Sequence, residues 1–292
     1  MPEIFPKISI ITPSYNQGQF IEETILSILN QGYPNLEYII IDGGSNDNTL
    51  DIIRKYERRI SYWVSEKDAG LYYALNKGFQ KASGEILGWL NSDDILHKNA
   101  LKTIASVLLD LPDIEWLGGV PNHIDELGRS VWVGNRPKWN KYRYLSFDFK
   151  YIQQEGIFWK KNLWIKSGGY ISTEYALASD LELWSRFFNY AHLYTLPSIL
   201  ASFRVRSANQ KSMERLDDYN EEAMRILQNM KCSKIESRNL KIKNSFIYRF
   251  LKTFNFWRIF YQLGYGKAEK AIDKTPPNIY FDRNIQKFVR EE

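Results

Sequence analysis

The sequence predicts an α/β fold, with a mostly parallel sheet flanked by helices and a helical extension at the C-terminus. Three observations support this prediction. Short apolar runs alternate with amphipathic stretches in the N-terminal half, polar side chains follow each apolar run, and the composition changes near Lys231. A repeated strand–helix order is typical of parallel sheets, whose ligands gather at the carboxyl ends of the strands. We therefore expect residues 1–230 to form one α/β domain and residues 231–292 a basic amphipathic helical tail.

The first half of the chain contains four strand candidates and three helix candidates. Tyr38–Ile41 is apolar without interruption, as expected of a strand that is covered on both faces. The strand candidates are Ile8–Ile11, Tyr38–Ile41, Ile60–Ser65 and Glu85–Leu90. The helix candidates, with apolar side chains at helical spacing, are Phe20–Leu29, Leu50–Ile53 and Gly70–Ala82.

Beyond Pro112 the pattern changes to shorter strands and turns as far as Trp159. Asp125–Gly128 has the composition of a hairpin turn. Two more helical segments are expected at Asp180–Tyr190 and Asp217–Met230. We expect the loops between Pro112 and Trp159 to lie on the side of the protein where an acceptor substrate binds.

The composition limits the classes of protein that the chain can belong to. Its 292 residues are 44% hydrophobic and 15% aromatic, which is enough for a large core and excludes general disorder. A single cysteine, Cys232, excludes an internal disulfide and a cysteine-only metal site. Neither a secretory signal nor an apolar run of about 20 residues is found, so we predict a cytoplasmic protein. The formal charge of +5 indicates anionic partners only weakly.

The segment that follows Lys231 is basic and aromatic. Its apolar side chains, among them Phe246, Phe250 and Trp257, have the spacing of an amphipathic helix. Such a helix suits a membrane interface, where the rings enter the head-group boundary and the cations meet anionic lipid. The same spacing suits a helix that packs on the catalytic domain, so both interpretations stay open. The basic residues of the segment are Lys231, Lys234, Arg238, Lys241, Lys243, Arg249, Lys252 and Arg258.

Asp93 and Asp94 directly follow an apolar strand. Their oxygens could hold Mg²⁺ or Mn²⁺ and join the ion to a diphosphate. Ser92 and the two aspartates also precede a helical stretch, Ala100–Leu109, and could cap it. Because three other strand ends are polar as well, we favour the cation site.

Asp42 and Tyr15 occupy two of these strand ends. Asp42 follows three isoleucines and precedes Gly43 and Gly44, which permit a tight turn. Its carboxylate could accept hydrogen bonds from a base or a ribose, or it could form an Asx-turn that ends the strand. Tyr15 could stack on a base or be an ordinary half-buried aromatic residue.

Asp180 opens the amphipathic helix of ALASDLELW. It could cap that helix or pair with Arg186. In a catalytic role it would act as a general base, removing a proton from an acceptor hydroxyl while a sugar carbon is attacked. A cation would meanwhile stabilise the departing nucleotide diphosphate, and a single displacement would invert the anomeric centre.

Taken together, these motifs resemble the inverting glycosyltransferases of family 2, which have the GT-A fold. The resemblance spans Lys7 to Lys211, and its motifs occur in the family's order. They are ISIITPSYNQGQFIEETILSILNQ, LEYIIIDGGSNDNTLDII, SEKDAGLYYALNKGFQKASGEILGWLNSDD, QQEGIFWKKNLWIKSGGY and ASDLELWSRF.

The resemblance implies a nucleotide-sugar donor, with a uridine diphosphate sugar favoured, and Mn²⁺ or Mg²⁺ as cofactor. It implies a glycan or lipid-linked acceptor and work in cell-surface polysaccharide synthesis, in the cytoplasm or on the inner face of the membrane. It also assigns roles to residues of this chain. The donor would be bound by Pro13, Tyr15, Asp42, Gly43, Ser92 and Asp94, the metal by Asp93, and the catalytic base would be Asp180.

Four positions depart from the family's pattern. Gly43 stands where many members have a second acid, and Leu75 where many have an arginine. The metal motif begins with Asn91 rather than aspartate. Arg206, in FRVRSANQKS, replaces a common histidine. We therefore expect Arg206 to contact the donor's diphosphate and to reduce the dependence on a metal.

Three other functions fit the sequence less well than glycosyl transfer. A sugar-nucleotide-forming nucleotidyltransferase would need a glycine-rich, basic phosphate loop after the first strand, and TPSYNQG does not supply one. A catalytically silent glycan- or nucleotide-binding module with the same fold stays the alternative, although Asp93 and Asp180 argue against it. Nucleic acid is not an expected partner, because an acidic crevice would repel a phosphate chain.

Overall fold

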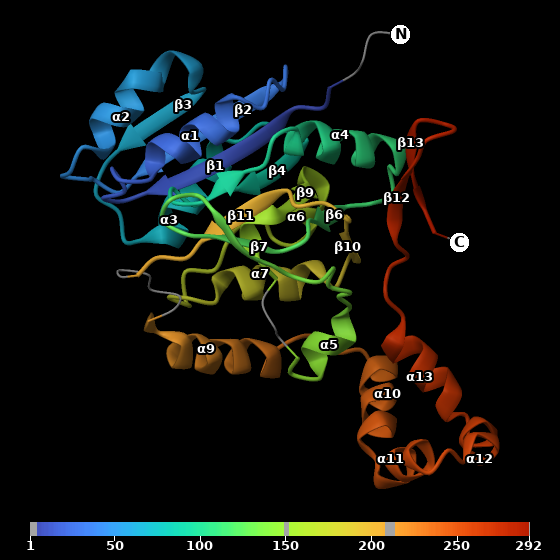
Figure 1. Cartoon of the computed structure of the whole chain (residues 1–292). Coiled ribbons are helices and arrows are strands. Elements are labelled where there is room, and N and C mark those ends of the chain that lie inside the picture. The colour runs from blue at the N-terminus through green and yellow to red at the C-terminus, as the bar shows by residue number, and fades with distance from the viewer. Residues whose placement is uncertain (1–4, 149–151, 208–213, 292) are drawn as a thin grey trace.

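The larger part of the molecule is built on a seven-stranded sheet (Figure 1). The computed structural model describes residues 5–148, 152–207 and 214–291. The strand order is β10-β6-β9-β4-β1-β2-β3, and β9 is antiparallel to both neighbours whereas the other pairs are parallel. The predicted mostly parallel sheet is therefore confirmed. The strands are β1 (Ile8–Ser14), β2 (Leu36–Asp42), β3 (Tyr62–Ser65), β4 (Ile86–Trp89), β6 (Trp116–Gly118), β9 (Ile157–Lys160) and β10 (Leu193–Thr195).

Helices cover both faces of this sheet. One face packs on α1 (Ile21–Leu29), α2 (Thr49–Tyr56) and α4 (Ala100–Asp110). The opposite face packs on α3 (Leu71–Lys81), α5 (Lys141–Leu145), α6 (Lys161–Lys166), α7 (Ser179–Phe187) and α9 (Leu216–Gln228). Two short 3₁₀ turns, η1 (Glu57–Arg59) and η2 (Gln154–Gly156), join elements of the fold.

The apolar run in β2 follows from burial on both faces. Tyr38 and Ile40 join the core beneath α1, whereas Ile39 and Ile41 join the core beneath α3. Successive side chains of a strand point to opposite faces, so a strand inside a two-sided sheet needs apolar residues at every position.

A second, four-stranded sheet has the order β5-β11-β7-β8. Its strands are β5 (Ile95–Leu96), β7 (Asn122–Ile124), β8 (Ser130–Val133) and β11 (Ala201–Arg204). β7 and β8 form the predicted hairpin, and the N–H of Gly128 donates to the carbonyl of Asp125 at 3.0 Å in its turn. β11 follows α7 in the chain, yet it pairs with β5, just beyond Asp93 and Asp94.

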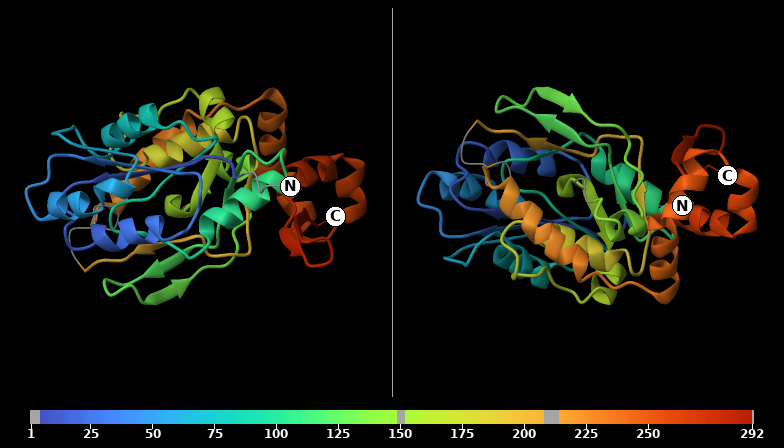
Figure 2. Two further views of the ribbon diagram at one scale, coloured as in Figure 1. Left: turned by 90° about the horizontal axis from the view of Figure 1, so that it is seen from above. Right: turned by 90° about the horizontal axis from the view of Figure 1, so that it is seen from below.

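The C-terminal part projects from the domain next to α5 (Figures 1 and 2). The predicted helical extension is confirmed, but its described residues form four short helices and a hairpin rather than one continuous amphipathic helix. Asn255, with a φ of +57°, follows α11, and Gly264, with a φ of +75°, follows α12. These left-handed residues end the helices and turn the chain. The elements are α10 (Lys234–Asn244), α11 (Phe246–Thr253), α12 (Trp257–Gln262), α13 (Tyr265–Asp273), β12 (Ile279–Asp282) and β13 (Lys287–Arg290).

The terminal hairpin returns to the α/β domain. The N–H of Phe288 donates to the carboxylate of Asp110 at 2.9 Å, and Arg290 pairs with Asp113 at 2.6 Å. Ile279 is fully buried in the core that α4 shares with the sheet. The last residues of the chain are thus part of the domain's surface, while α10–α13 form a separate projection.

Candidate active site

The carboxyl ends of β1 and β2 form one side of the candidate site. Ser14 is paired with Asp42 across the two strands, and the N–H of Gly43 donates to the carbonyl of Ser14 at 2.8 Å. Pro13 is buried within β1. Tyr15, just past the end of β1, is 60% exposed, so its ring is free to stack on a flat ligand.

Asp42 is fully buried in its own turn. Its carboxylate accepts hydrogen bonds from the N–H groups of Gly44 and Ser45, at 3.0 and 2.8 Å, and from the hydroxyls of Ser45 and Ser65, at 2.5 and 2.6 Å. Three of these bonds end on Oδ2 and one on Oδ1, so the carboxylate is held chiefly by the residues of its own turn. The arrangement is the Asx-turn that the sequence left open as the second role of Asp42.

Asp68 is the carboxylate that the sequence reasoning missed at this end of the sheet. A side chain at Gly43 would place its Cβ 3.3 Å from both carboxylate oxygens of Asp68. One of these oxygens accepts the N–H of Gly70 at 2.8 Å. Asp68 therefore supplies an acid beside the position where Gly43 lacks one. The signal was present, because Asp68 lies at the polar end of β3.

Asp94 and Asp93 differ in exposure, because the side chain of Asp93 keeps 15% of its surface exposed. Asp94 is fully buried, and one carboxylate oxygen accepts the N–H of Arg204 at 2.9 Å. Its other oxygen, Oδ2, has no hydrogen-bond partner among the described residues. Burial raises the pKa of Asp94 well above its usual value, with repulsion from Asp93 and Glu155 adding to the shift. Asp94 thus anchors the loop.

The alternative in which this acidic segment caps α4 does not match the structure. β5 lies between the acidic residues and α4, and the residue at the N-cap is Asn99, in a left-handed conformation. Ser92 is buried beside the two aspartates.

Arg206 lies against Asp93. Its Nε is 3.2 Å from Oδ2 of Asp93, and both side chains keep a small exposed fraction, 14% and 15%. Nη1 of Arg206 donates to the side-chain oxygen of Gln17 at 3.4 Å. Burial raises the pKa of Asp93, while the charges of Arg206 and Arg204 oppose that shift. β11 therefore delivers a cation to the acidic loop that follows β4. Residues 208–212 of the FRVRSANQKS segment lie outside the described residues.

Arg204 holds the acidic loop in place. Its guanidinium is fully buried and donates to the carbonyls of Asp93 and Asp125, at 2.7 and 2.9 Å, and to the carboxylate of Glu23, at 2.6 Å. Leu75, where the family often has arginine, is fully buried in the core under α3. The basic side chains of the site therefore come from β11 and its extension.

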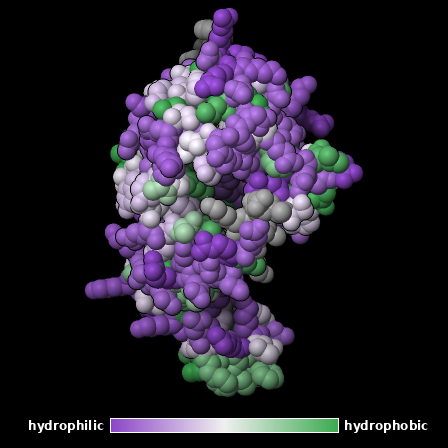
Figure 3. Space-filling model, turned by 90° about the vertical axis from the view of Figure 1, so that its left-hand side faces the viewer, coloured by the Kyte–Doolittle hydropathy of each residue, from purple (hydrophilic) through white to green (hydrophobic). Residues whose placement is uncertain are grey.

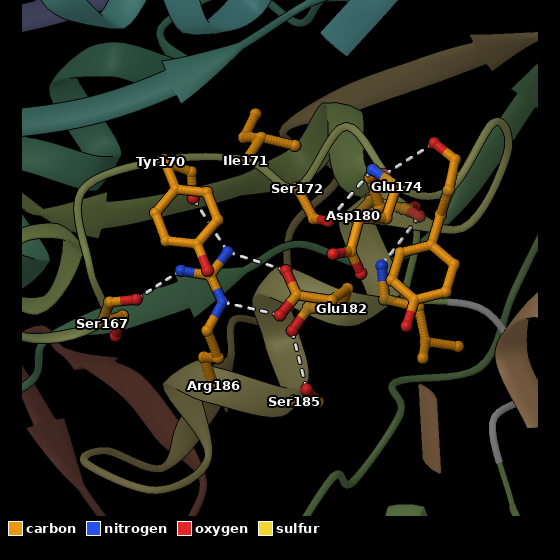
Figure 4. Close-up of polar contacts among 12 residues, drawn as sticks. Ser167, Tyr170, Ile171, Ser172, Glu174, Asp180, Glu182, Ser185 and Arg186 are labelled. Atoms are coloured by element: carbon orange, nitrogen blue, oxygen red, sulfur yellow. Dashed lines mark hydrogen bonds and ion pairs between the residues drawn. The ribbon is translucent and has the colours of Figure 1, made fainter. Parts of the chain in front are cut away.

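Asp180 lies in the first turn of α7. Figure 4 shows its carboxylate apart from Arg186, which makes two 2.8 Å hydrogen bonds to Glu182. The predicted alternative of an Asp180–Arg186 pair is therefore wrong. One Asp180 oxygen accepts the N–H of Leu181 at 2.8 Å. Burial raises the pKa of Asp180 to about 6, and the charge of Glu222 adds to the shift.

The start of α7 is fixed from two sides. The carboxylate of Glu222 in α9 accepts the N–H groups of Ala176, Leu177 and Ala178, each at 2.9 Å. One turn beyond Asp180, the ring of Trp184 stacks on Trp89 of β4, with centroids 5.7 Å apart and planes 8° from parallel. Trp89 precedes Asp93 by four residues. The stack therefore packs the helix that carries Asp180 against the strand that leads to Asp93.

Glu155, in η2, was not among the predicted site residues. It is buried between the two parts of the site, and burial raises its pKa to about 8. The charges of Asp180 and Asp93 both add to this shift. Asp93 and Asp180, which are far apart in the sequence, therefore both lie within electrostatic range of one buried carboxyl group. Apart from its position in the QQEGIFW segment, no residue pattern marks Glu155 as buried.

The carboxylates of the site differ from a metal site built from protein side chains alone. Among the described residues, no group of three His, Cys, Asp or Glu side chains is placed to hold a metal ion. Magnesium and manganese sites in nucleotide enzymes, however, use one or two carboxylates and take their other ligands from phosphates and water. Asp93, whose carboxylate is partly exposed in an acidic loop, fits that mode of binding.

The family of the chain follows from a match over more than half of its length. The family model described as glycosyl transferase family 2 matches residues 9–170, which include β1, β2, the acidic loop and Glu155. The chain belongs to glycosyl transferase family 2. It is therefore a glycosyltransferase, and its α/β architecture is the GT-A fold.

Two relatives show how much of this family 2 protein is similar in sequence to known glycosyltransferases. TuaG of Bacillus subtilis (strain 168), named as a glycosyltransferase of teichuronic acid biosynthesis, is 41% identical over 100 residues, which is 33% of this chain and 40% of TuaG. The uncharacterized glycosyltransferase RT0329 of Rickettsia typhi is 28% identical over 73% of this chain and 69% of its own length. The chain thus spans less than half of TuaG.

Solved structures share the fold. TarS of S. aureus, residues 1–349 in complex with UDP-GlcNAc, superimposes with a TM-score of 0.64 at 20% identity, covering 82% of this chain and 73% of that one. The mannosyltransferase PcManGT of Pyrobaculum calidifontis, in complex with GDP-Man and Mn²⁺, gives a TM-score of 0.56 at 20% identity, covering 77% and 66%. Within the described part of this chain, no helix is long and apolar enough to cross a bilayer.

Proposed function

We propose that this glycosyltransferase moves a sugar from a uridine diphosphate donor to a hydroxyl of a glycan or lipid-linked acceptor, with inversion, in cell-surface polysaccharide synthesis. One observation carries the catalytic part of the proposal: the ring of Trp184, one turn beyond Asp180, stacks on Trp89, four residues before Asp93. The elements that carry a diphosphate-side group and a candidate base therefore pack against each other. The donor class and pathway are supported by the names of TarS with UDP-GlcNAc and of TuaG.

The proposed reaction divides the work among residues of known position. Tyr15 stacks on the base at the end of β1, while Asp42 and Gly43 shape the turn against which the nucleoside lies. Arg206 and Asp93 face the diphosphate, and a Mn²⁺ or Mg²⁺ ion at Asp93 would neutralise the charge of the leaving nucleotide. Asp180 removes the proton of the acceptor hydroxyl as its oxygen attacks the anomeric carbon. A single displacement of this kind inverts that carbon.

Nucleotide titration tests the donor site. We would measure the binding of UDP, GDP and dTDP by calorimetry, with and without Mn²⁺, to the wild type and to Asp93→Ala. Asp51→Ala is the matched control, because Asp51 lies on α2 with its side chain 80% exposed. Metal-dependent binding of UDP that Asp93→Ala loses and Asp51→Ala keeps would support the proposal. Absence of binding of every nucleotide would favour a catalytically silent module.

Product analysis tests the stereochemistry. With UDP-GlcNAc as donor, proton NMR of the first product formed distinguishes an inverted anomeric carbon from a retained one. A product with the anomeric configuration of the donor would contradict the single displacement assigned to Asp180, whatever nucleotide the protein binds.

A further inference from the structure

The far end of the C-terminal projection carries a contiguous apolar surface. Figure 3 shows it as the hydrophobic area at the bottom of the molecule, below a hydrophilic stretch of the same projection. We call it the apolar tip. Its side chains, which are 41–80% exposed, are Phe246, Ile247, Phe250, Phe254, Phe256 and Trp257.

The rings of the tip contact one another. The centroid of Phe250 lies 6.1 Å from that of Phe246, 4.8 Å from Phe254 and 6.0 Å from Phe256. Beneath them, Tyr248, Leu251 and Phe260 form a small buried core of their own. The exposed rings are therefore not needed to fill that core. Large contiguous apolar surfaces of this kind mark sites of interaction with a partner or a membrane.

The charge of the projection is strongly positive. Residues 231–292 contain 14 Lys and Arg against 6 Asp and Glu, a net charge of +8, whereas residues 1–230 have a net charge of −3. From residue 231 to 263 there are eight basic side chains and one acid, Glu236. That acid is paired with Lys141 of α5 at 2.9 Å. Lys252 of α11 is paired with Glu269 at 2.6 Å, whereas Arg249 and Arg258 are exposed and make no ion pair among the described residues.

A basic groove adjoins the tip. It has a volume of about 690 Å³ and is lined by Lys234, Arg238 and Lys241 of α10 together with hydroxyl groups, among them that of Ser245. Among the described residues, these three cations make no ion pair. Ser245 is also the N-cap of α11, which carries the first rings of the tip. Cationic and apolar surfaces therefore lie next to each other.

We infer that the apolar tip and its basic groove form a docking surface for an anionic lipid bilayer. Aromatic and aliphatic side chains enter the boundary between head groups and acyl chains, while Lys and Arg meet anionic head groups. A second copy of the chain is a poorer occupant, because pairing two tips would bring two strongly positive surfaces together. The inference does not depend on the donor nucleotide, since binding to vesicles requires none.

Vesicle co-sedimentation of the full chain tests the docking surface. We expect the wild type to sediment with vesicles of equal parts phosphatidylcholine and phosphatidylglycerol, and much less with phosphatidylcholine alone. Phe250→Ser/Phe254→Ser should reduce partitioning about tenfold, because two rings leave the interface. The matched control is Leu127→Ser/Ile165→Ser, which removes two exposed apolar side chains of the α/β domain (76% and 61% exposed).

A charge reversal tests the electrostatic part. Arg249→Glu/Arg258→Glu should also reduce binding by about tenfold or more, since each basic residue near an anionic surface contributes a several-fold change in partitioning. Arg58→Glu/Lys98→Glu makes the same change in net charge on the exposed surface of the α/β domain and should bind as the wild type does.

Two results would overturn the inference. The first is that Phe250→Ser/Phe254→Ser and Arg249→Glu/Arg258→Glu sediment with anionic vesicles as fully as the wild type does. The second is a wild type that forms dimers without lipid, measured by light scattering, and becomes monomeric in Phe250→Ser/Phe254→Ser, because the tip would then be a self-association surface. Nucleotide binding measured on the same samples would stay unchanged in either case, so the donor proposal stands or falls separately.

Discussion

Arg206 forms an ion pair with Asp93 in the acidic loop that follows β4, with Nε 3.2 Å from Oδ2. The guanidinium stands where the family often has histidine, and it is held from the other side by Gln17. The charge of Arg206 opposes the rise in the pKa of Asp93 that burial causes, and its N–H groups can donate to a diphosphate oxygen when a nucleotide sugar enters.

Arg206→Ala should therefore weaken the binding of the donor nucleotide. Loss of a charge-assisted hydrogen bond costs about 1.5–3 kcal/mol, or roughly tenfold to a hundredfold in affinity. Calorimetry with UDP in the presence of EDTA, and then of Mn²⁺, measures the effect, and the loss should be larger without metal. Arg206→Lys, which keeps the charge but not the planar fork, should fall between the two. Full affinity and turnover in Arg206→Ala would show that Arg206 does not contact the diphosphate.

Asp180 should make the reaction depend on pH. Its pKa is raised to about 6, chiefly by burial, and a base works only when ionised. As the pH falls through about 6 the carboxylate becomes protonated, so kcat/KM should fall on the acidic side with a midpoint near that value. Asp180→Asn should lower kcat by about 10²–10⁴-fold and leave UDP affinity unchanged. An Asp180→Asn enzyme with the wild-type rate and acid limb would require another base.

Asp68 should contribute to binding the base of the nucleotide. Its carboxylate oxygens lie next to Gly43, whereas Asp42, the acid predicted for this contact, is buried and already accepts four hydrogen bonds from its turn and Ser65. We expect Asp68→Ala to weaken UDP binding by about tenfold to a hundredfold, the usual effect of one hydrogen bond to a charged group. Glu57→Ala, at an exposed position in η1, serves as the control. Equal UDP affinity in Asp68→Ala and the wild type would leave Tyr15 as the base contact.

The fold and half of the site could be predicted because both follow from local patterns. β2 needs apolar residues on both faces, and its polar end is visible at Asp42. The donor contact of Asp42 stays a prediction, and its turn contacts could not be foreseen because a sequence does not show how many donors surround a carboxylate. Glu155 was missed for a related reason: it precedes an apolar strand and no periodic pattern marks it as buried. Burial arises only when η2 packs between β4, β5 and β11.

The tail illustrates a different limit. Its apolar spacing is helical from Phe246 to Phe260, but the left-handed residue Asn255 divides this stretch, and a second one, Gly264, turns the chain again after it. Helical spacing of apolar residues assumes one continuous helix axis, so it does not show where the chain turns and a new helix begins. Asn and Gly are the residues that adopt this conformation most readily, so their positions were the available cue.

Glu155→Gln should change how stability depends on pH. The pKa of Glu155 is about 8 in the folded protein, raised chiefly by burial and further by Asp180 and Asp93, against an ordinary value of 4.5. A raised folded-state pKa gives stability that is complete below pH 4.5 and is lost as the pH rises through about 8. Glutamine is neutral at every pH and has nearly the same shape, so the variant should lack this loss. Urea unfolding at pH 6 and pH 9 should show a fall in the free energy of unfolding of at least about 1 kcal/mol for the wild type and a smaller fall for Glu155→Gln. Equal falls in the two proteins would mean that Glu155 is ionised in the folded state at neutral pH, and the crevice would then hold one more negative charge to be balanced by Arg206 or a metal.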